Sequence, residues 1–231
     1  MKYVMVVDDG CWFPSLIKPF DEIIKAGAYQ WYRAFKGEVK HIKNMQDSDY
    51  QNYDIVHIDL YGTIAPKVPE IKEKIKNSST VMIMNLDYSV SLIQNGFTNL
   101  AFFLKALQCA DLIFAQEPNQ ARVLKLILKE IKKDTPVHVI PHPVDTRMKK
   151  FTKDYTERLN MIATVFHRYD QQYFVQSLIV EGAKGISALL GYDPNMNLPN
   201  VNQLYNMVHN YTNWNDFIDL FKMARVGISY Y

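Results

Sequence analysis

The sequence has little cysteine and no unbroken apolar run long enough to cross a membrane. Only Cys11 and Cys109 occur among its 231 residues, with no CxxC pair and no Cys/His spacing typical of a zinc site. A membrane-spanning helix needs roughly 18 consecutive apolar residues, and no basic and apolar leader precedes the first apolar run. We therefore expect reduced thiols, no metal site and a cytoplasmic protein.

Charge of one sign and glycine-rich phosphate loops are also scarce. The formal net charge is +2, which is too small to require a nucleic acid or an anionic membrane as partner. The 9 glycines form neither a GxGxxG nor a GxxxxGK(S/T) pattern. This absence disfavours the usual dinucleotide oxidoreductases and the P-loop NTPases. The 6 histidines show no HExxH-like spacing, so none is assigned to a metal.

Short β-rich runs alternate with helix-compatible segments, in a chain that is 48% apolar and 22% charged. In the first part of the chain, the predicted strands are Lys2–Asp8, Asp54–Leu60, Thr80–Leu86, Asp111–Ala115 and Val137–Ile140. The segments expected to contain helices are Ser15–Phe35, Pro66–Lys76, Thr98–Gln108 and Pro118–Lys132. This alternation predicts an α/β fold, with parallel sheets that carry helices on both faces.

A polar segment, Phe151–Arg158, interrupts this pattern, which then restarts. Further strands are predicted at Leu159–Val165, Ile186–Leu190, Met207–His209 and Val226–Tyr230. Helices are expected in Gln171–Lys184 and Asn215–Met223. We therefore expect one Rossmann-like domain over residues 1–150 and a second over residues 151–231, joined near residues 145–158.

Two prolines bracket a histidine in the stretch VHVIPHPVD, which starts at Val137. Proline lacks the amide proton that a central strand needs, and it biases the preceding residue toward extended geometry. Pro141 and Pro143 are therefore expected to end the last strand of the first domain and to lead the chain out of the sheet.

The succession ADLIFAQEPNQARVLKLILKE, VHVIPHPVD and LNMIATVFHRYDQQYF resembles the two-domain GT-B glycosyltransferases, in particular the retaining enzymes of glycosyltransferase family 4. The resemblance is most specific over residues 110–168 and 214–231. It implies a GT-B architecture of two Rossmann-like domains and transfer of a sugar from a nucleoside-diphosphate donor to an acceptor hydroxyl. The nucleotide sugar is then a substrate, and no further cofactor is expected. His142 and Pro143 replace the more usual asparagine and glycine.

The resemblance implies a donor-binding role for Arg168. In the family, an arginine after the first strand of the second domain contacts the donor diphosphate, and a guanidinium can bind two phosphate oxygens at once. His167 stands where the family has glycine, and Gln171 and Gln172 stand where a lysine is expected. A surface pairing with an acid such as Asp170 is the alternative role for Arg168.

The resemblance also places the acceptor at the carboxyl ends of the first domain's strands, the general location of ligands in open α/β sheets. The loops Asp9–Phe13 and Asn85–Ser89 are expected to leave neighbouring strands and to line the acceptor pocket together. The candidate acceptor-binding residues are Asp9, Gly10, Cys11, Asn85 and Tyr88.

Asp87 is the candidate catalytic residue, because a carboxylate in that loop can orient or deprotonate an acceptor hydroxyl. Capping of the following helix is its alternative role, and capping or a solvated turn is the alternative for Asp9.

The family's two donor-site glutamates, eight positions apart, would follow the segment VGISYY, where the sequence ends. The second domain is therefore expected to be incomplete, and a partner or a missing segment would complete it. A non-catalytic α/β binding or assembly subunit is thus an alternative function, and a viral-type transferase acting on modified DNA bases is another.

The basic segment Ala121–Lys133 is either a peripheral membrane contact or the solvated outer face of a helix. The nucleotide, the sugar and the acceptor stay open.

Overall fold

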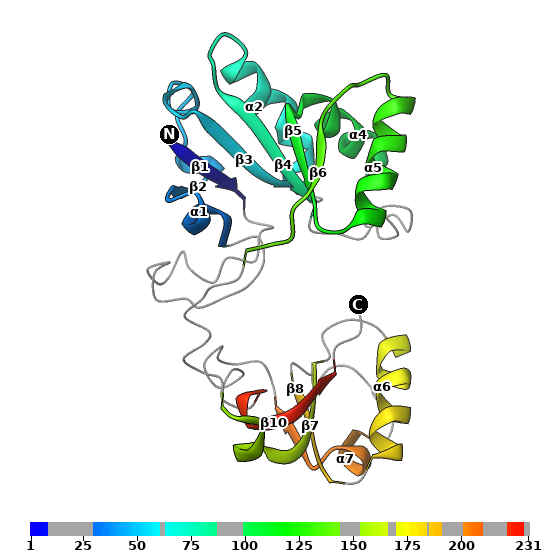
Figure 1. Ribbon diagram of the computed structural model, residues 1–231. Helices are drawn as coiled ribbons and strands as arrows, with labels where there is room; N and C mark the ends of the chain where they lie inside the picture. The colour runs from blue at the N-terminus through cyan, green and yellow to red at the C-terminus, as the bar shows by residue number, and fades with distance from the viewer. Residues whose placement is uncertain are drawn as a thin grey trace. The chain divides into compact units, whose positions relative to one another are not determined.

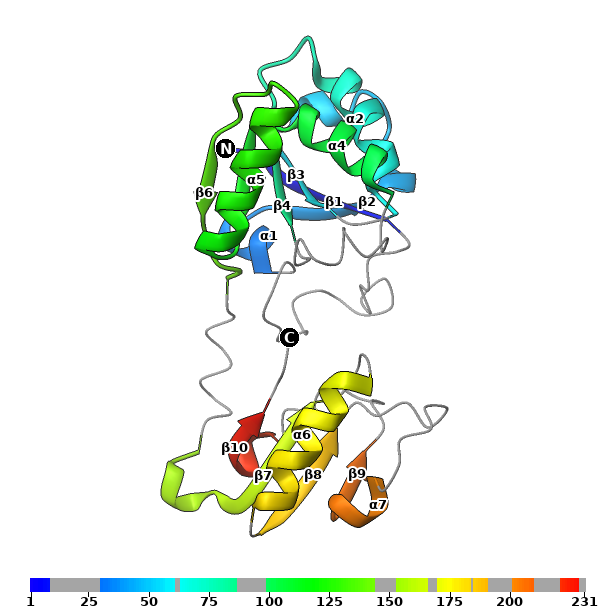
Figure 2. The ribbon, with the colours of Figure 1, turned by 90° about the vertical axis from the view of Figure 1, so that its right-hand side faces the viewer.

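The computed structural model describes residues 1–8, 30–60, 63–86, 99–143, 153–165, 170–183, 185–190, 201–209 and 221–228. The chain divides into two compact units, Met1–Thr146 and Arg147–Tyr231. Each unit contains its own parallel sheet with helices packed on it (Figures 1 and 2).

The first unit is built on a six-stranded sheet with the order β2-β1-β3-β4-β5-β6. The strands are β1 Tyr3–Val7, β2 Glu38–His41, β3 Ile55–Leu60, β4 Val81–Leu86, β5 Leu112–Ala115 and β6 Val137–Val139. Every adjacent pair is parallel, so all carboxyl ends meet at one edge of the sheet (Figure 1). The structure thus confirms the predicted α/β class with parallel sheets.

One strand of this sheet, β2, was not predicted from the sequence. Its residues EVKH include two charged side chains, and its burial is only partial. An edge strand has only one neighbouring strand, so it can form from such a sequence without the apolar run that marks a central strand.

Helices pack on both faces of the first sheet. The helices α2 (Val68–Ile75), α4 (Leu100–Cys109) and α5 (Pro118–Glu130) bury apolar side chains in one core with β1, β3, β4 and β5. The short helix α1 (Trp31–Ala34) packs on the opposite face against β1, β4 and β5. The helix α1 lies within the segment Ser15–Phe35, which was expected to contain a helix. Residues 15–29 of that segment lie outside the described residues.

Side-chain caps fix the starts of two of these helices. Asn99 Oδ1 accepts a hydrogen bond from the backbone amide of Ala101 at 3.0 Å, at the start of α4. The carboxylate of Glu117 accepts from Asn119 and Gln120 in the same way at α5. These side chains satisfy amides that have no partner within the helix.

The second unit contains a four-stranded parallel sheet with the order β10-β7-β8-β9. Its strands are β7 Leu159–Val165, β8 Ile186–Leu190, β9 Met207–His209 and β10 Ala224–Ile228. Its helices are α6 Asp170–Gly182 and α7 Val201–Leu204, and a 3-10 turn, Tyr155–Glu157, precedes β7. Most of the predicted helix over residues 215–223 lies outside the described residues.

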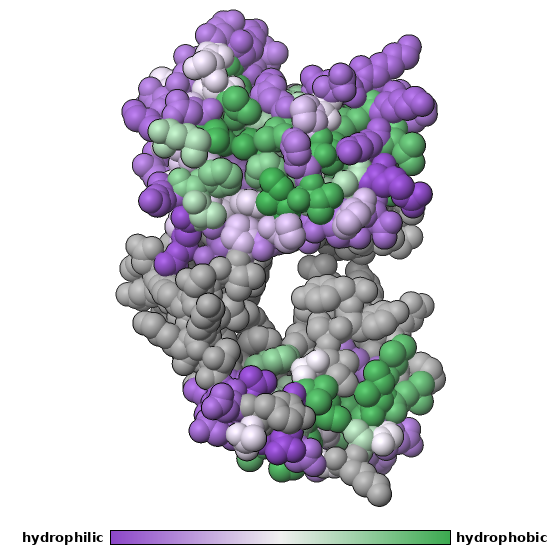
Figure 3. All heavy atoms as spheres, in the orientation of Figure 1, coloured by the Kyte–Doolittle hydropathy of each residue, from purple (hydrophilic) through white to green (hydrophobic). Residues whose placement is uncertain are grey.

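The described residues of the second unit form two small buried clusters. Val180, Leu189, Val201 and Tyr205 form one buried cluster, which joins α6 and α7 to the sheet. In contrast, α6 leaves apolar side chains exposed at Val175, Leu178 and Ile179, and hydrophobic surface is visible over this helix in Figure 3. None of the helices within the described ranges combines the length and hydropathy that crossing a bilayer requires.

The fold predicts different costs for two leucines on α5. Leu124 is fully buried in the core of the first unit, whereas Leu126 is 57% exposed. Leu124→Ala should lower the free energy of unfolding by about 2–5 kcal/mol, because it leaves a cavity. Leu126→Ala is the matched control and should change it by less than about 0.5 kcal/mol. Urea denaturation measures both values, and equal effects would contradict the placement of α5.

Candidate active site

Two buried polar residues lie side by side near the carboxyl edge of the first sheet. Asp59 on β3 and Asn85 on β4 are direct partners in the register of these strands, and their exposed fractions are 4% and 1%. Asn85 Nδ2 donates a hydrogen bond to Asp59 Oδ1 at 2.7 Å. Burying a carboxylate is costly unless it is hydrogen-bonded, and this contact offsets part of that cost for Asp59.

His142 brings a third element to the same place. It lies between Pro141 and Pro143, just beyond the end of β6, and its Nε2 atom is 3.4 Å from Asn85 Nδ2. The ring of Trp31 on α1 meets the His142 ring edge-on, with centroids 6.3 Å apart. The exit from the last strand, predicted from its two prolines, therefore delivers an imidazole to Asn85.

The alternation of side chains along β3 explains why these polar groups share one face. Val56, Ile58 and Leu60 join the core formed with α2, α4 and α5. His57 and Asp59, at the odd positions, project to the opposite face, because successive side chains of a strand point to opposite sides. On that face His57 contacts the ring of Trp31 on α1.

His57 is fully buried among aromatic rings. The centroids of Trp31 and Phe114 lie 5.5 and 5.7 Å from that of His57. Burial lowers the pKa of His57 from 6.5 to about 3, which outweighs a raising effect of the Asn85 amide, and the nearby His142 lowers it further. The ring is therefore neutral at physiological pH.

The proton of the neutral ring is assigned by its neighbours. Tyr3 Oη lies 2.6 Å from His57 Nδ1. Burial, and then the charge of Asp59, raise the pKa of Tyr3, so its hydroxyl stays protonated and can donate to Nδ1. With the hydroxyl as donor to Nδ1, the ring proton sits on Nε2.

The orientation of the Asn85 amide follows from its contact with Asp59. Its Nδ2 atom donates to Asp59. Among the described residues, neither His57 Nε2 nor Asn85 Oδ1 has a hydrogen-bond partner, although both atoms are buried. A flipped amide would set its oxygen against the Asp59 carboxylate. The donated bond to Asp59 therefore fixes the orientation of the amide, and His57 and Asn85 are close neighbours that are not joined by a hydrogen bond.

A second acidic residue, Asp8, lies at the end of β1. It is buried and accepts hydrogen bonds from Thr63 Oγ1 and Lys67 Nζ, both at 2.9 Å. The lysine neutralises the carboxylate, and the two contacts tie the end of β1 to the segment that follows β3. Asp8 therefore has a structural role that positions the start of the loop carrying Asp9.

Glutamines of α5 and of the turn before it hold the end of β4. Gln116 Nε2 and Gln120 Nε2 donate to the carbonyl oxygen of Leu86 at 2.9 and 3.2 Å. Gln120 Oε1 accepts in turn from the backbone amide of Gln116 at 2.7 Å. These hydrogen bonds hold Leu86, the last residue of β4, in place at the carboxyl edge of the sheet.

Most of the predicted site residues lie outside the described part of the chain. The structure describes Asn85 but not Asp9, Gly10, Cys11, Asp87, Tyr88 or Arg168. The expectation that the two acceptor loops leave neighbouring strands is wrong, because β3 lies between β1 and β4. Both strands nevertheless end at the same edge, and the roles of these residues stay predictions.

The sequence reading missed His57 and Asp59. A signal was present in DIVHIDL, where the two polar residues alternate with apolar ones and so share one face of the strand. Because most of its residues are apolar, the run predicts a buried strand, and its polar face is easily missed.

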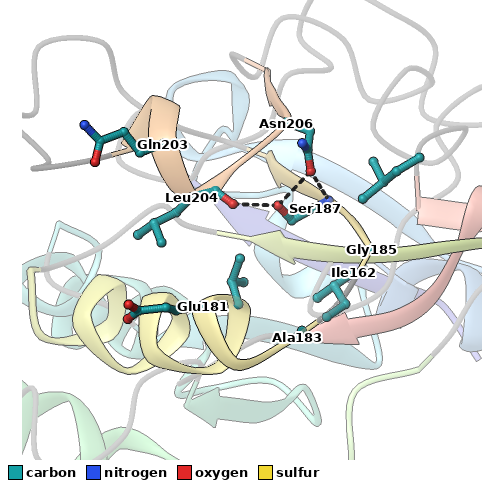
Figure 4. Close-up of a pocket in the computed structure, with 10 residues that line it drawn as sticks. Ile162, Glu181, Ala183, Gly185, Ser187, Gln203, Leu204 and Asn206 are labelled. Atoms are coloured by element: carbon teal, nitrogen blue, oxygen red, sulfur yellow. Dashed lines mark hydrogen bonds between the residues drawn. The ribbon is translucent and has the colours of Figure 1, made fainter.

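A cavity in the second unit does not offer a comparable site. It has a volume of about 310 Å³ and lies near the amino end of β8, next to Gly185 and Ser187 (Figure 4). The Ser187 hydroxyl donates to the carbonyl of Leu204 at 2.7 Å, and Asn206 Oδ1 accepts from the Ser187 amide at 2.9 Å. These polar groups satisfy each other at the edge opposite to the one where open α/β sheets bind ligands.

No cluster of three or more His, Cys, Asp or Glu residues within the described ranges is arranged to hold a metal ion. The thiol of Cys109 is free, and burial raises its pKa. The polar groups described near the carboxyl edge are the carboxylate of Asp59, the amide of Asn85 and the imidazoles of His57 and His142. Groups of these kinds can bind and orient a hydroxyl.

No family model matches the sequence, and no curated protein gives a significant match. Among solved structures, an alpha-glucosyltransferase in complex with UDP-glucose and DNA containing an abasic site is similar, with a TM-score of 0.63 and 14% identity. That alignment covers 98% of this chain and 71% of the other. This likeness confirms the predicted fold class, an α/β protein with Rossmann-like parallel sheets as in the GT-B glycosyltransferases.

A D-isomer specific 2-hydroxyacid dehydrogenase from Lactobacillus delbrueckii ssp. bulgaricus, in its NAD-complexed form, was also found, at 11% identity. The alignment covers 100% of this chain and 63% of that one. Its TM-score of 0.29 is too low to support a common fold.

The buried neutral His57 predicts a specific loss of stability in acid. Its pKa is about 3 when folded and about 6.5 when unfolded, so between these values the unfolded chain binds the additional proton. Folding stability should therefore fall as the pH decreases from 7 to 4.5, by on the order of 2 kcal/mol from this group. His57→Gln keeps a donor and an acceptor but cannot titrate, so its stability should depend less on pH. Identical pH profiles from urea denaturation would rule out a buried neutral His57.

Proposed function

We propose that this protein is a glycosyltransferase that moves a sugar from a nucleoside-diphosphate donor to a hydroxyl bound at the carboxyl edge of the first sheet. The observation that carries the proposal is the buried hydrogen bond between Asp59 and Asn85 at that edge. The likeness to a glucosyltransferase that binds UDP-glucose supports the class of reaction. The donor to test first is therefore UDP-glucose.

The proposed chemistry assigns a role to the Asp59 carboxylate. In the reaction, the acceptor oxygen forms a bond to the anomeric carbon, the bond from that carbon to the diphosphate breaks, and the acceptor hydroxyl loses its proton. A carboxylate at hydrogen-bonding distance can orient this hydroxyl and take up the proton. Asn85 holds Asp59 in place, and His142 adds a second polar group beside it.

The residues predicted from the sequence complete the proposed site. Asp87 and Tyr88 follow directly from β4, and Asp9, Gly10 and Cys11 follow from the end of β1. We keep Asp87 as a candidate catalytic residue beside Asp59, and the others as candidate acceptor-binding residues. Arg168 is proposed to bind the donor diphosphate. A peripheral membrane contact through Ala121–Lys133 and a cytoplasmic location stay predictions.

DNA is a second candidate acceptor. The similar glucosyltransferase was solved with DNA containing an abasic site, and this observation is the support for testing a nucleic-acid acceptor here. A non-catalytic binding subunit is the alternative to either enzyme.

A direct test measures nucleotide release from UDP-, GDP- and ADP-sugars, each with and without duplex DNA or a mixture of glycan acceptors. We expect one donor to bind and to release its nucleoside diphosphate faster when the correct acceptor is present. Absence of binding to every donor would contradict the proposed function and favour the binding subunit.

Asp59→Asn should separate chemistry from donor binding. The change keeps the size of the side chain but removes the base, so kcat should fall by about 10²–10⁴-fold while the affinity for the donor stays within about twofold. Asp54→Asn is the matched control, since Asp54 precedes the amino end of the same strand and is exposed. Steady-state kinetics and calorimetry measure both quantities. Full activity in Asp59→Asn would exclude Asp59 from the reaction.

Arg168→Ala should affect donor binding instead. A charge-assisted contact with phosphate is worth about 1.5–3 kcal/mol, so affinity for the nucleoside diphosphate should fall about tenfold to a hundredfold. Arg168→Lys should give an intermediate value, because a point charge keeps the attraction but loses the bidentate geometry. Arg158→Ala, in the same unit, is the control and should bind like the wild type. Equal affinities for Arg168→Ala and the wild type would leave Arg168 with a surface role.

A further inference from the structure

A basic groove lies at the edge of the first sheet opposite the candidate active site. It has a volume of about 610 Å³ and is formed by the end of α5 and the start of β6. Its basic side chains are those of Lys125, Lys129, Lys132, Lys133 and His138. Among the described residues that line it, Asp134 alone is acidic. Hydrophilic side chains gather over this end of α5 at the upper right of Figure 3.

The backbone holds the walls of this groove in a defined place. Lys132 has a φ of 55°, and the amide of Lys133 donates to the carbonyl of Leu128 at 2.9 Å, so the chain reverses directly after α5. Thr135 Oγ1 then donates to the carbonyl of Ala110 at 3.1 Å. The carbonyl of Pro136 accepts from the amide of Ile113 at 3.0 Å. The basic side chains therefore extend from an ordered scaffold.

Among the described residues, the lysines of this groove have no acidic partners, unlike the lysines in and next to α2. Lys67 pairs with Asp8, Lys72 with Asp111, Lys74 with Glu70 and Lys76 with Glu73. Within the described ranges, none of the four groove lysines forms such a pair. Like charges at close spacing repel each other, and an anion in the groove would relieve this repulsion.

We propose that this groove binds the sugar-phosphate backbone of a single-stranded nucleic acid. Lys125 and Lys129 lie one turn apart on α5, and Lys132 and Lys133 lie in the turn that follows the helix, so the four positive charges converge on one groove. A nucleic-acid strand carries a negative charge at every phosphate, and a positively charged groove can follow such a backbone.

The shape of the site favours a strand over a membrane surface. The lysines surround a hollow, whereas a bilayer presents a broad, flat surface and is bound through apolar side chains that insert beside the basic ones. Leu128, the leucine that lines the groove, is buried, and the exposed Leu126 does not line it. Because lysine contacts phosphate as a point charge, binding should not depend on base sequence. The proposal does not depend on sugar transfer.

The test is binding of a fluorescently labelled 20-nucleotide single-stranded DNA, followed by anisotropy at several salt concentrations. The groove variant is Lys125→Gln with Lys129→Gln, and the control is Lys2→Gln with Lys76→Gln, which removes the same charge elsewhere on the first unit. The plot of log affinity against log salt should become shallower by about 1.4 in the groove variant, which corresponds to about a 25-fold loss of affinity at 0.1 M salt. The control should stay within about twofold of the wild type.

Three results would overturn the proposal. The first is absence of binding to the oligonucleotide by the wild-type protein. The second is an equal loss in both variants, which would show that net charge alone matters. The third is groove-dependent binding to phosphatidylserine vesicles without binding to the oligonucleotide, which would assign the groove to a membrane surface. The melting temperatures of the variants confirm that each is folded. A failure of sugar transfer would leave this binding measurement unaffected.

Discussion

The hydrogen bond from Asn85 Nδ2 to Asp59 Oδ1 is the contact on which the polar edge of the first sheet depends. A sheet packed on both faces excludes water, so a carboxylate within it costs several kcal/mol unless it is hydrogen-bonded. A hydrogen bond to a charged group returns about 1.5–3 kcal/mol and also fixes the position of the acid. The bond forms only if the Asn85 amide is turned with its nitrogen toward Asp59.

The strands were largely predictable because their apolar runs are short, β-rich and separated by helical segments. The strands β7, β8 and β9 coincide with their predicted ranges. In the first sheet the predicted strands also lie in their chain order, and the unpredicted strand β2 departs from it by lying outside β1. The strand β3 lies between β1 and β4, and it places Asp59, which was not predicted as a site residue, opposite the predicted Asn85. Pairing of parallel strands depends on contacts between distant segments, which local sequence patterns do not encode.

The amino-acid composition does not show how charge is distributed over the folded chain. The net charge of +2 indicated no preference for anionic partners. In the folded chain, the lysines at residues 67–76 pair with acids, whereas those near the end of α5 gather around a groove. The two edges of the first sheet therefore differ in character, with a buried acid and amide at the carboxyl edge and a group of lysines around a groove at the amino edge.

The most direct test of the arrangement at the carboxyl edge is the nitrogen-15 NMR spectrum of the His57 ring, recorded from pH 7.5 to pH 4.5. The two ring nitrogens have distinct chemical shifts when protonated and when bare, so the spectrum identifies the tautomer. The account predicts a neutral ring throughout this range, with the proton on Nε2 and with Nδ1 accepting from Tyr3. A proton on Nδ1, or a ring protonated on both nitrogens by pH 5, would contradict this arrangement of the buried polar groups.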